Sequence, residues 1–221
     1  MQDSFWDNHY KNFSLSQPSL FAQSCLNGLI TADDTVVELG CGNGRDGLAI
    51  AQRASRYVGL DACPNAVGRF KEVIESTELA ASGCLSVQQA NFTTLDFNVF
   101  GEGSKRLVIY SRFSLHSIDY EEADRLLDNV AQITTAPWVM VLEARTIFDT
   151  LYGQGTKVGR NEFRTDHYRR FIDPDEFLVY LTRRFSVRYF EISKGFAPFG
   201  DEDPIVMRAE IQSESKNRAR C

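Results

Sequence analysis

One stretch of the chain, residues 36–46 (VVELGCGNGRD), constrains the fold most, because an apolar run there ends in three glycines within five residues. The apolar run predicts a buried strand, and the glycines predict a sharp turn whose backbone can touch a ligand closely. The stretch also contains Gly42-Asn-Gly44-Arg-Asp-Gly47, a literal GxGxxG, which is commonly interpreted as a dinucleotide site. The sequence therefore predicts a ligand site at the turn after this strand.

Strand-like and helix-like patterns alternate along most of the chain. We expect strands at 35–39, 57–60, 85–89, 107–111, 138–142, 185–192 and 205–211. We expect helices at 18–30, 44–54, 64–79, 120–132 and 173–184. This alternation predicts an α/β, Rossmann-like fold with a doubly wound seven-stranded sheet. No helix separates the last two strands, so the mostly parallel sheet should end in an antiparallel C-terminal hairpin.

The same patterns predict one main domain with smaller additions. Residues 1–34 form an N-terminal lid and first helix, and 35–212 form the main domain. The interval 144–172 lacks an obvious helix or strand and is rich in aromatic and basic residues, so we expect a substrate-binding loop there. The polar tail 213–221 is expected to be disordered.

Composition excludes several functional classes. A net charge of −6 disfavours a nucleic-acid partner, and no segment reaches the ~18–20 apolar residues of a membrane span. Five scattered cysteines without a CxxC pair, together with three histidines, argue against a metal site and against a disulfide framework. Without a signal-peptide pattern, the expected location is cytoplasmic, and the expected assembly is a monomer or homodimer.

The charges around the glycine turn separate two kinds of adenosine cofactor. Asp61 ends the second strand, 21 residues after Gly40, where an acid can accept both ribose hydroxyls. Counted from Leu39, however, the literal GxGxxG starts two residues too late for a dinucleotide fingerprint. Glu38 and Asp46 flank the turn, and carboxylates there oppose a pyrophosphate but suit a positively charged ligand.

These motifs resemble those of class I S-adenosylmethionine-dependent methyltransferases over roughly 35–145. VVELGCGNGRD resembles the first family motif, VGLDACPNAV the second and QQANFTTL the third, in which Asn91 replaces the usual acid. RLVIYSRFSLHSI stands in the place of the fourth. The resemblance implies S-adenosyl-L-methionine as cofactor and S-adenosyl-L-homocysteine as product. The cofactor residues it implies are Glu38, Gly40, Cys41, Gly42, Gly44, Asp46, Asp61, Ala62, Asn91, Phe92 and Ser111.

The acceptor is expected beyond the fourth and fifth strands. This chain has neither the Asn/Asp-Pro-Pro-aromatic nor the Pro-Cys motif of nucleobase methyltransferases. His116 is a candidate general base, and Arg112 is a candidate contact of the ligand or of an acid such as Glu143. Tyr168 is a third catalytic candidate. Arginines concentrate in TDHYRRF, which suits an anionic acceptor, although a solvated basic stretch is the alternative. Candidate substrate contacts are Trp6, Tyr10, Glu143, Arg145, Tyr152, His167, Arg169 and Arg170.

Three short segments, FWDNHY…QPSLFA, YSRFSLH and LYGQG…TDHYRRF, resemble methyltransferases of bacterial surface-polysaccharide (O-antigen and capsule) modification. That resemblance implies an O-methyltransferase for a phosphorylated or phosphoramidate-bearing small molecule or glycan terminus. The alternative is a hydroxyl, carboxylate or amine methyltransferase with His116 as general base. A non-catalytic cofactor-binding subunit and a dinucleotide oxidoreductase are further hypotheses.

Overall fold

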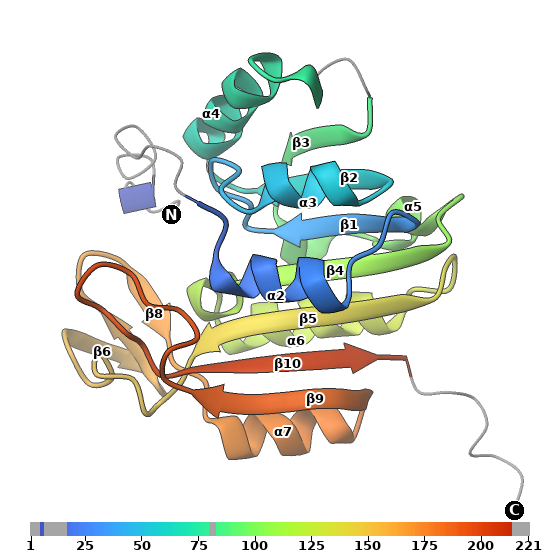
Figure 1. Ribbon diagram of the computed structural model, residues 1–221. Coiled ribbons are helices and arrows are strands. Elements are labelled where there is room, and N and C mark those ends of the chain that lie inside the picture. The colour runs from blue at the N-terminus through green and yellow to red at the C-terminus, as the bar shows by residue number, and fades with distance from the viewer. Residues whose placement is uncertain (1–4, 7–16, 80–82, 214–221) are drawn as a thin grey trace, which may run out of the picture.

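The computed structural model describes residues 5–6, 17–79 and 83–213. The main sheet has seven strands in the order β3-β2-β1-β4-β5-β10-β9, and the first five are parallel. β10 runs antiparallel between β5 and β9 (Figure 1). The predicted doubly wound sheet and its antiparallel C-terminal hairpin are confirmed.

All seven expected strands are present within about one residue at their starts, and the five expected helices are present but shorter. The elements are α2 (Leu20–Gly28), β1 (Asp34–Leu39), α3 (Gly47–Arg53), β2 (Arg56–Asp61), α4 (Pro64–Glu75), β3 (Leu85–Gln89), α5 (Asn98–Gly101), β4 (Arg106–Arg112), α6 (Tyr120–Ala131), β5 (Trp138–Arg145), β6 (Thr156–Gly159), β7 (Glu162–Arg164), β8 (Tyr168–Arg170), α7 (Pro174–Thr182), β9 (Ser186–Ser193) and β10 (Val206–Gln212).

Each face of the sheet is covered by its own set of helices. Alternate residues of β1, such as Val36 and Val37, belong to different core clusters because successive side chains point to opposite faces. One cluster packs against α2, α3 and α4, and the other against α5, α6 and α7. The parallel strands are therefore buried on both faces, which explains their almost uninterrupted apolar runs.

The interval 144–172 contains a small sheet that the sequence pattern did not predict. Its order is β6-β7-β8, all antiparallel, and it stands at the edge of the main sheet where β5 ends (Figure 1). Tyr152, Phe163 and Phe171 pack edge to face on one another and form its apolar centre. These strands have only three or four residues each, too few to show a clear alternation.

The topology fixes where a ligand can bind. The chain passes from β1 to β2 and β3 on one side of β1, and then crosses over to β4 and β5 on the other side. A crevice is expected at that switch point. No helix among the described residues is long and apolar enough to cross a membrane. Tyr10 and most of the tail, residues 214–221, lie outside the described residues.

Candidate active site

A cavity of about 830 Å³ opens at the carboxyl edge of the parallel strands. Its walls come from the turn after β1, the ends of β2, β4 and β5, the small sheet, and the loop between β9 and β10. Residues 5 and 6 also line it. The pocket therefore gathers segments from nearly the whole length of the chain at one edge of the sheet.

The glycine turn adopts a conformation that side chains would obstruct. Gly44 has a φ of +87°, and a Cβ built on it would lie 2.2 Å from the ring of Phe70 in α4. At Gly40, with a φ of +70°, a Cβ would lie 3.0 Å from the Cβ of Ser114. Both glycines let the turn pack against its neighbours while its backbone faces the pocket.

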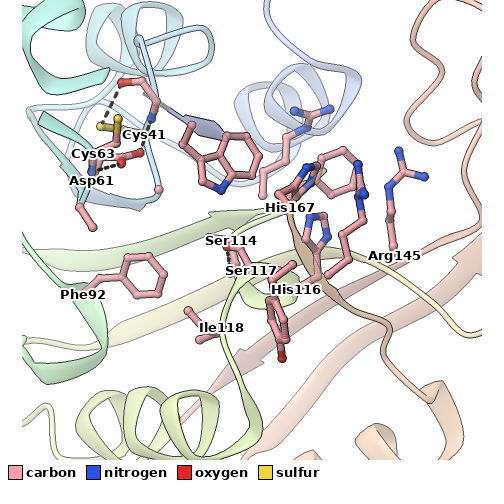
Figure 2. A pocket seen from close by; sticks show the side chains of 18 of the residues that line it. Cys41, Asp61, Cys63, Phe92, Ser114, His116, Ser117, Ile118, Arg145 and His167 are labelled. Carbon is pink, nitrogen blue, oxygen red and sulfur yellow. Dashed lines mark hydrogen bonds between the residues drawn. The ribbon is translucent and has the colours of Figure 1, made fainter. Parts of the chain in front are cut away.

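Asp61 ties the glycine turn to the start of α4. Its Oδ2 accepts a hydrogen bond from Gly42 N at 2.9 Å, and its Oδ1 accepts one from Cys63 N at 2.8 Å. Burial raises the pKa of this carboxyl, and the backbone N–H groups oppose that rise. Asp61 lines the pocket near Cys41 and Cys63 (Figure 2). The carboxylate has further acceptor capacity with which it can bind a ligand hydroxyl.

The two acids that flank the turn have different partners. Glu38 is buried, and it accepts a hydrogen bond from the Tyr57 hydroxyl. Burial, followed by the charge of Asp46, raises the pKa of Glu38 well above its usual value. Asp46 accepts hydrogen bonds from Ser19 N, Ser19 Oγ and the Tyr110 hydroxyl, each at 2.7 Å. Asp46 thus anchors the start of α2, whereas Glu38 is the carboxyl that a cationic ligand would stabilise in its ionised form.

Asn91 and Phe92 line the pocket beyond the end of β3. The Asn91 Oδ1 accepts hydrogen bonds from the backbone N and the hydroxyl of Thr93, at 3.0 and 2.8 Å, and so caps a short 3-10 helix. Phe92 is buried and presents an apolar side chain at this end of the pocket, where Figure 2 shows it near Ile118. This arrangement suits a flat, apolar ligand part.

Two arginines share one buried carboxylate at the acceptor end. Arg112 Nε donates to Glu143 Oε1 at 3.0 Å, and Arg208 Nε donates to Glu143 Oε2 at 2.8 Å. Glu143 is 1% exposed and does not line the pocket, whereas Arg112 does. The carboxylate holds Arg112 from behind and neutralises only one of the two guanidinium charges.

Phe113 follows Arg112 in a backbone conformation that is unusual for its residue type. Its φ is +59°, and the only other described non-glycine residue with a positive φ is Asn161. The guanidinium carbons of Arg112 and Arg145 lie 4.5 and 5.7 Å from the centre of its ring. Arg145 itself donates to Asp149 at 3.1 Å and to Glu202 at 2.7 Å.

His116 lies in the 3-10 helix 115–117 and is buried. Its Nδ1 has no hydrogen-bond partner among the described residues. Burial, followed by the nearby charges of Arg145 and Arg169, lowers the pKa of His116 well below its usual value. The imidazole is therefore neutral at pH 7, the form in which it can accept a proton.

The helix that carries His116 is held in place by Arg170. The guanidinium of Arg170 donates to the backbone carbonyls of Ile118 and Leu115, both at 3.0 Å. It also lies over the ring of Tyr120, 4.6 Å from the centre. Arg170 is 3% exposed and does not line the pocket, so its role here is structural.

His167, in the turn between β7 and β8, lines the pocket and contacts the aromatic residues 5 and 6. Its ring stacks on Phe5 at 4.2 Å and lies 5.0 Å from Trp6. Its Nδ1 lies 2.9 Å from a carboxylate oxygen of Asp166. Figure 2 shows His167, His116 and Arg145 gathered on the side of the pocket opposite Asp61.

Two further residues of β8 face the pocket. Arg169 donates to Thr165 Oγ1 at 2.6 Å and to Asp166 at 3.2 Å. Burial, followed by the charge of Glu162, raises the pKa of Tyr168. Tyr168 therefore keeps its proton at neutral pH and can donate a hydrogen bond but cannot act as a base.

The structure brings most of the expected site residues to one pocket. Lining it are the cofactor candidates Glu38, Gly40, Cys41, Gly42, Asp46, Asp61, Ala62, Asn91 and Phe92. The catalytic and substrate candidates His116, Arg112, Tyr168, Trp6, Arg145, His167 and Arg169 also line it.

Five candidates lie outside the pocket lining. Gly44 packs on Phe70, and the hydroxyl of Ser111 shares a hydrogen bond with that of Ser114. Glu143 and Arg170 are buried supports, and the Tyr152 hydroxyl donates to Asn161 in the small sheet. None of these five residues lines the pocket, because each packs on or bonds with other parts of the protein.

Sequence reasoning missed several lining residues. Phe113, Ser114, Arg164 and the loop residues Phe199 and Glu202 all line the pocket. The loop could have been placed there from the predicted hairpin, since β9 runs parallel to β5 and ends at the same edge. No sequence pattern points to the conformation of Phe113.

Comparisons with known proteins match this architecture. Residues 36–136 match a family model described as a methyltransferase domain. No individual curated protein sequence matches the chain. The prediction of a methyltransferase is thereby confirmed at the level of the domain.

Three solved structures illustrate the likeness in fold. A SAM-dependent methyltransferase from Methanosarcina mazei is 18% identical with a TM-score of 0.69, covering 85% of this chain and 96% of that one. The N-methyltransferase NodS from Bradyrhizobium japonicum, in complex with S-adenosyl-L-homocysteine, is 15% identical with a TM-score of 0.58, covering 97% and 90%. Magnesium protoporphyrin IX methyltransferase from Synechocystis, with bound SAM, is 14% identical with a TM-score of 0.55, covering 88% and 76%. The chain has the class I methyltransferase fold.

Proposed function

We propose that this chain transfers the methyl group of S-adenosyl-L-methionine to an oxygen of an anionic acceptor. The methyltransferase domain and the cofactor-bound structures of the same fold support the cofactor. The named acceptors of those proteins differ from one another, so they do not select an acceptor for this chain. The acceptor class is argued from the pocket itself.

The observation that carries the proposal is the set of arginines that line the pocket beyond β4 and β5 and on the small sheet, among them Arg112, Arg145 and Arg169. Glu38 and Asp61 line it beside the glycine turn, and the remaining acids among the described lining residues are Asp46, Asp119, Glu122 and Glu202, of which Glu202 pairs with Arg145. A cofactor with a sulfonium and an ammonium group suits the acidic end, and an anion suits the basic end. Arginine forks match the oxygens of phosphate and carboxylate groups particularly well.

The residues at the acidic end fit the parts of the cofactor. Asp61 has acceptor capacity for ribose hydroxyls, Phe92 and Ala62 offer apolar surface to the adenine, and Glu38 compensates positive charge. When bound, S-adenosyl-L-methionine supplies a methyl group on an activated sulfonium. The turn backbone at Gly40 and Gly42 provides the surface on which the rest of the cofactor lies.

The basic end aligns the acceptor without a strong base. An ionised phosphate oxygen already carries the lone pair that attacks the methyl carbon, so no proton has to be removed. Arg112, Arg145 and Arg169 hold and orient the anion. The neutral His116 can also donate a hydrogen bond or accept one.

The finer acceptor proposal is a phosphorylated or phosphoramidate-bearing small molecule or glycan terminus, as in surface-polysaccharide modification. It rests on the three sequence segments named above and on the basic end of the pocket. A panel of phosphorylated sugars, matched with their unphosphorylated forms, tests it with S-adenosyl-L-homocysteine release as readout. Turnover of the neutral sugars alone would reject the anionic acceptor.

The alternative is a hydroxyl, carboxylate or amine methyltransferase that uses His116 as general base. The Nδ1 of His116, which is buried and has no hydrogen-bond partner in the described part of the chain, favours it. The pH–rate profile separates the two: a base mechanism gives an acidic limb well below pH ~6.5 that disappears in His116→Gln. A profile without a histidine limb supports the ionised acceptor.

A further inference from the structure

Phe113 occupies a turn where its residue type is costly. Its N–H donates to Glu143 O at 2.8 Å and so extends the β4–β5 ladder by one residue. The chain then turns at once, and the Ser114 hydroxyl bonds with that of Ser111 at 2.7 Å. This tight turn requires a left-handed residue, and a φ of +59° strains any side chain with a Cβ.

A glycine or asparagine would serve such a turn with less strain. Strain of this kind persists where the side chain has a use, and it gathers at functional sites. The ring of Phe113 is half-buried, lines the pocket and lies 5.1 Å from the ring of His116. The turn alone therefore does not explain the phenylalanine.

The ring of Phe113 lies close to two arginines from the ends of β4 and β5. The guanidinium carbons of Arg112 and Arg145 both lie within 6 Å of its centre, a distance at which the face of the ring attracts a cation. Each guanidinium is held on another side by carboxylates, Arg112 by Glu143 and Arg145 by Asp149 and Glu202. Ring and carboxylates together restrict two long side chains that would otherwise be mobile.

We infer that Phe113 is a specificity-determining residue that fixes Arg112 and Arg145 as a pair for one anionic group of the acceptor. The inference rests on the proposed function, because it specifies how the basic end of that pocket is organised. Arg112 shares Glu143 with Arg208, so its charge is only partly balanced, whereas Arg145 has two carboxylate partners. An oxyanion on the pair is therefore attracted mainly by Arg112, and Arg145 adds hydrogen-bond donors. The pair therefore favours a compact anion with several oxygens, such as a phosphate monoester, over a neutral group.

The test uses inorganic phosphate as probe, titrated calorimetrically at constant ionic strength. Phe113→Asn and Phe113→Gly remove the ring and relieve the strain, and Phe113→Tyr keeps the ring. We expect phosphate affinity to fall about ten-fold in the Asn and Gly variants and to change less than about two-fold in Tyr. The matched control is Phe199→Asn, which removes another lining ring, one that lies near Arg45 instead, and should change phosphate affinity less than about two-fold.

Thermal stability and cofactor affinity exclude a merely structural role. The Asn and Gly variants should melt at or above the wild-type temperature, since the strain is relieved, and should bind S-adenosyl-L-homocysteine as tightly as the wild type. If either fails to fold, Phe113→Leu keeps the apolar bulk and should still lose phosphate affinity. In the Phe113→Asn background, Arg145→Gln should cost less phosphate affinity than it does in the wild type.

The outcomes separate this inference from the proposed function. Unchanged phosphate affinity in Phe113→Asn, or additive effects with Arg145→Gln, overturns the role of Phe113 alone. A wild-type protein that binds S-adenosyl-L-homocysteine but no phosphate also overturns it. A wild-type protein that binds no S-adenosyl-L-homocysteine contradicts the proposed function itself.

Discussion

Asp61 combines two tasks in one carboxylate, since it bonds the glycine turn and the start of α4 and also lines the pocket. We expect Asp61→Ala to weaken S-adenosyl-L-methionine binding by roughly 1–3 kcal/mol, because charge-assisted hydrogen bonds to the ribose are lost. Isothermal titration calorimetry measures the change. Asp33→Ala, at the opposite end of β1 and paired with Lys105 on the surface, is the control. Unchanged affinity in Asp61→Ala would remove this residue from the cofactor site.

His116 makes folding depend on pH in a predictable direction. Its pKa in the folded protein lies well below that in the unfolded chain, so the unfolded chain binds the proton more tightly. The contribution of His116 to stability is therefore complete above pH ~6.5 and falls by about 1 kcal/mol as the pH drops from 7.5 to 5.5.

Burial raises the pKa of Glu38 and Glu143, so these carboxyls bind protons more tightly in the folded protein than in the unfolded chain. Their contribution to stability therefore increases as the pH falls, opposite to that of His116. The quantity to compare is consequently the difference between wild type and His116→Gln in urea unfolding at the two pH values. His116→Gln should lose less stability on acidification than the wild type. Equal losses in the two proteins would show that His116 is protonated in the folded state as readily as in the unfolded chain.

Residue types and spacing predicted the acidic end of the pocket well, because the glycine turn and Asp61 follow directly from the strand ends. The acceptor end was less predictable. Whether an arginine faces the pocket or supports it from behind depends on partners far away in the sequence. Arg169 and Arg170 are adjacent, yet one lines the pocket and the other bonds carbonyls more than 50 positions away.

At the scale of elements, the packing of β8 against the 3-10 helix 115–117 sorts these two arginines, because Arg170 bonds the carbonyls at that helix and Arg169 lines the pocket. We expect Arg169→Gln to raise the acceptor Michaelis constant and to leave cofactor affinity unchanged. Arg170→Gln should instead lower the free energy of unfolding by about 1–3 kcal/mol, since it leaves the buried carbonyls of Leu115 and Ile118 without their donor.

Steady-state kinetics with the best acceptor, together with urea unfolding of both variants, compares the pair. The two substitutions are chemically identical and lie on neighbouring residues, so each serves as the control for the other. An Arg169→Gln variant that is less stable but has normal kinetics would contradict the role of Arg169 in acceptor binding.

The elements themselves were largely predictable from hydrophobic period, since the central strands are buried on both faces and read as apolar runs. The small sheet was not, because β6, β7 and β8 are too short for a period and gain their stability from Tyr152, Phe163 and Phe171 packing together. Helix ends were overestimated where polar residues continue a helical pattern beyond the packed face, as after Glu75.

For the whole molecule, a cofactor bound at the carboxyl edge should stabilise the fold, because it joins the glycine turn to the ends of β2 and β3. At a concentration of about 100 times its dissociation constant, S-adenosyl-L-homocysteine should add about 2.7 kcal/mol and raise the melting temperature by roughly 5–10 °C. Thermal scans with and without the ligand measure this shift. The reduced dinucleotide NADH at the same concentration should cause none, and an equal shift with NADH would favour the dinucleotide interpretation of the turn.

The place of β10 has a consequence for how the protein is made. β10 lies between β5 and β9, so β9 is synthesised before the strand that links it to the sheet exists. Until about residue 212 has left the ribosome, β5 exposes a long apolar edge (WVMVLEAR) with unpaired backbone groups. The nascent chain can assemble β1 to β5 early. Until β10 is made, however, the edge of β5 stays unpaired and prone to aggregation, and β9 has no strand to pair with. Chaperones or rapid synthesis of the last strand would matter most during that interval.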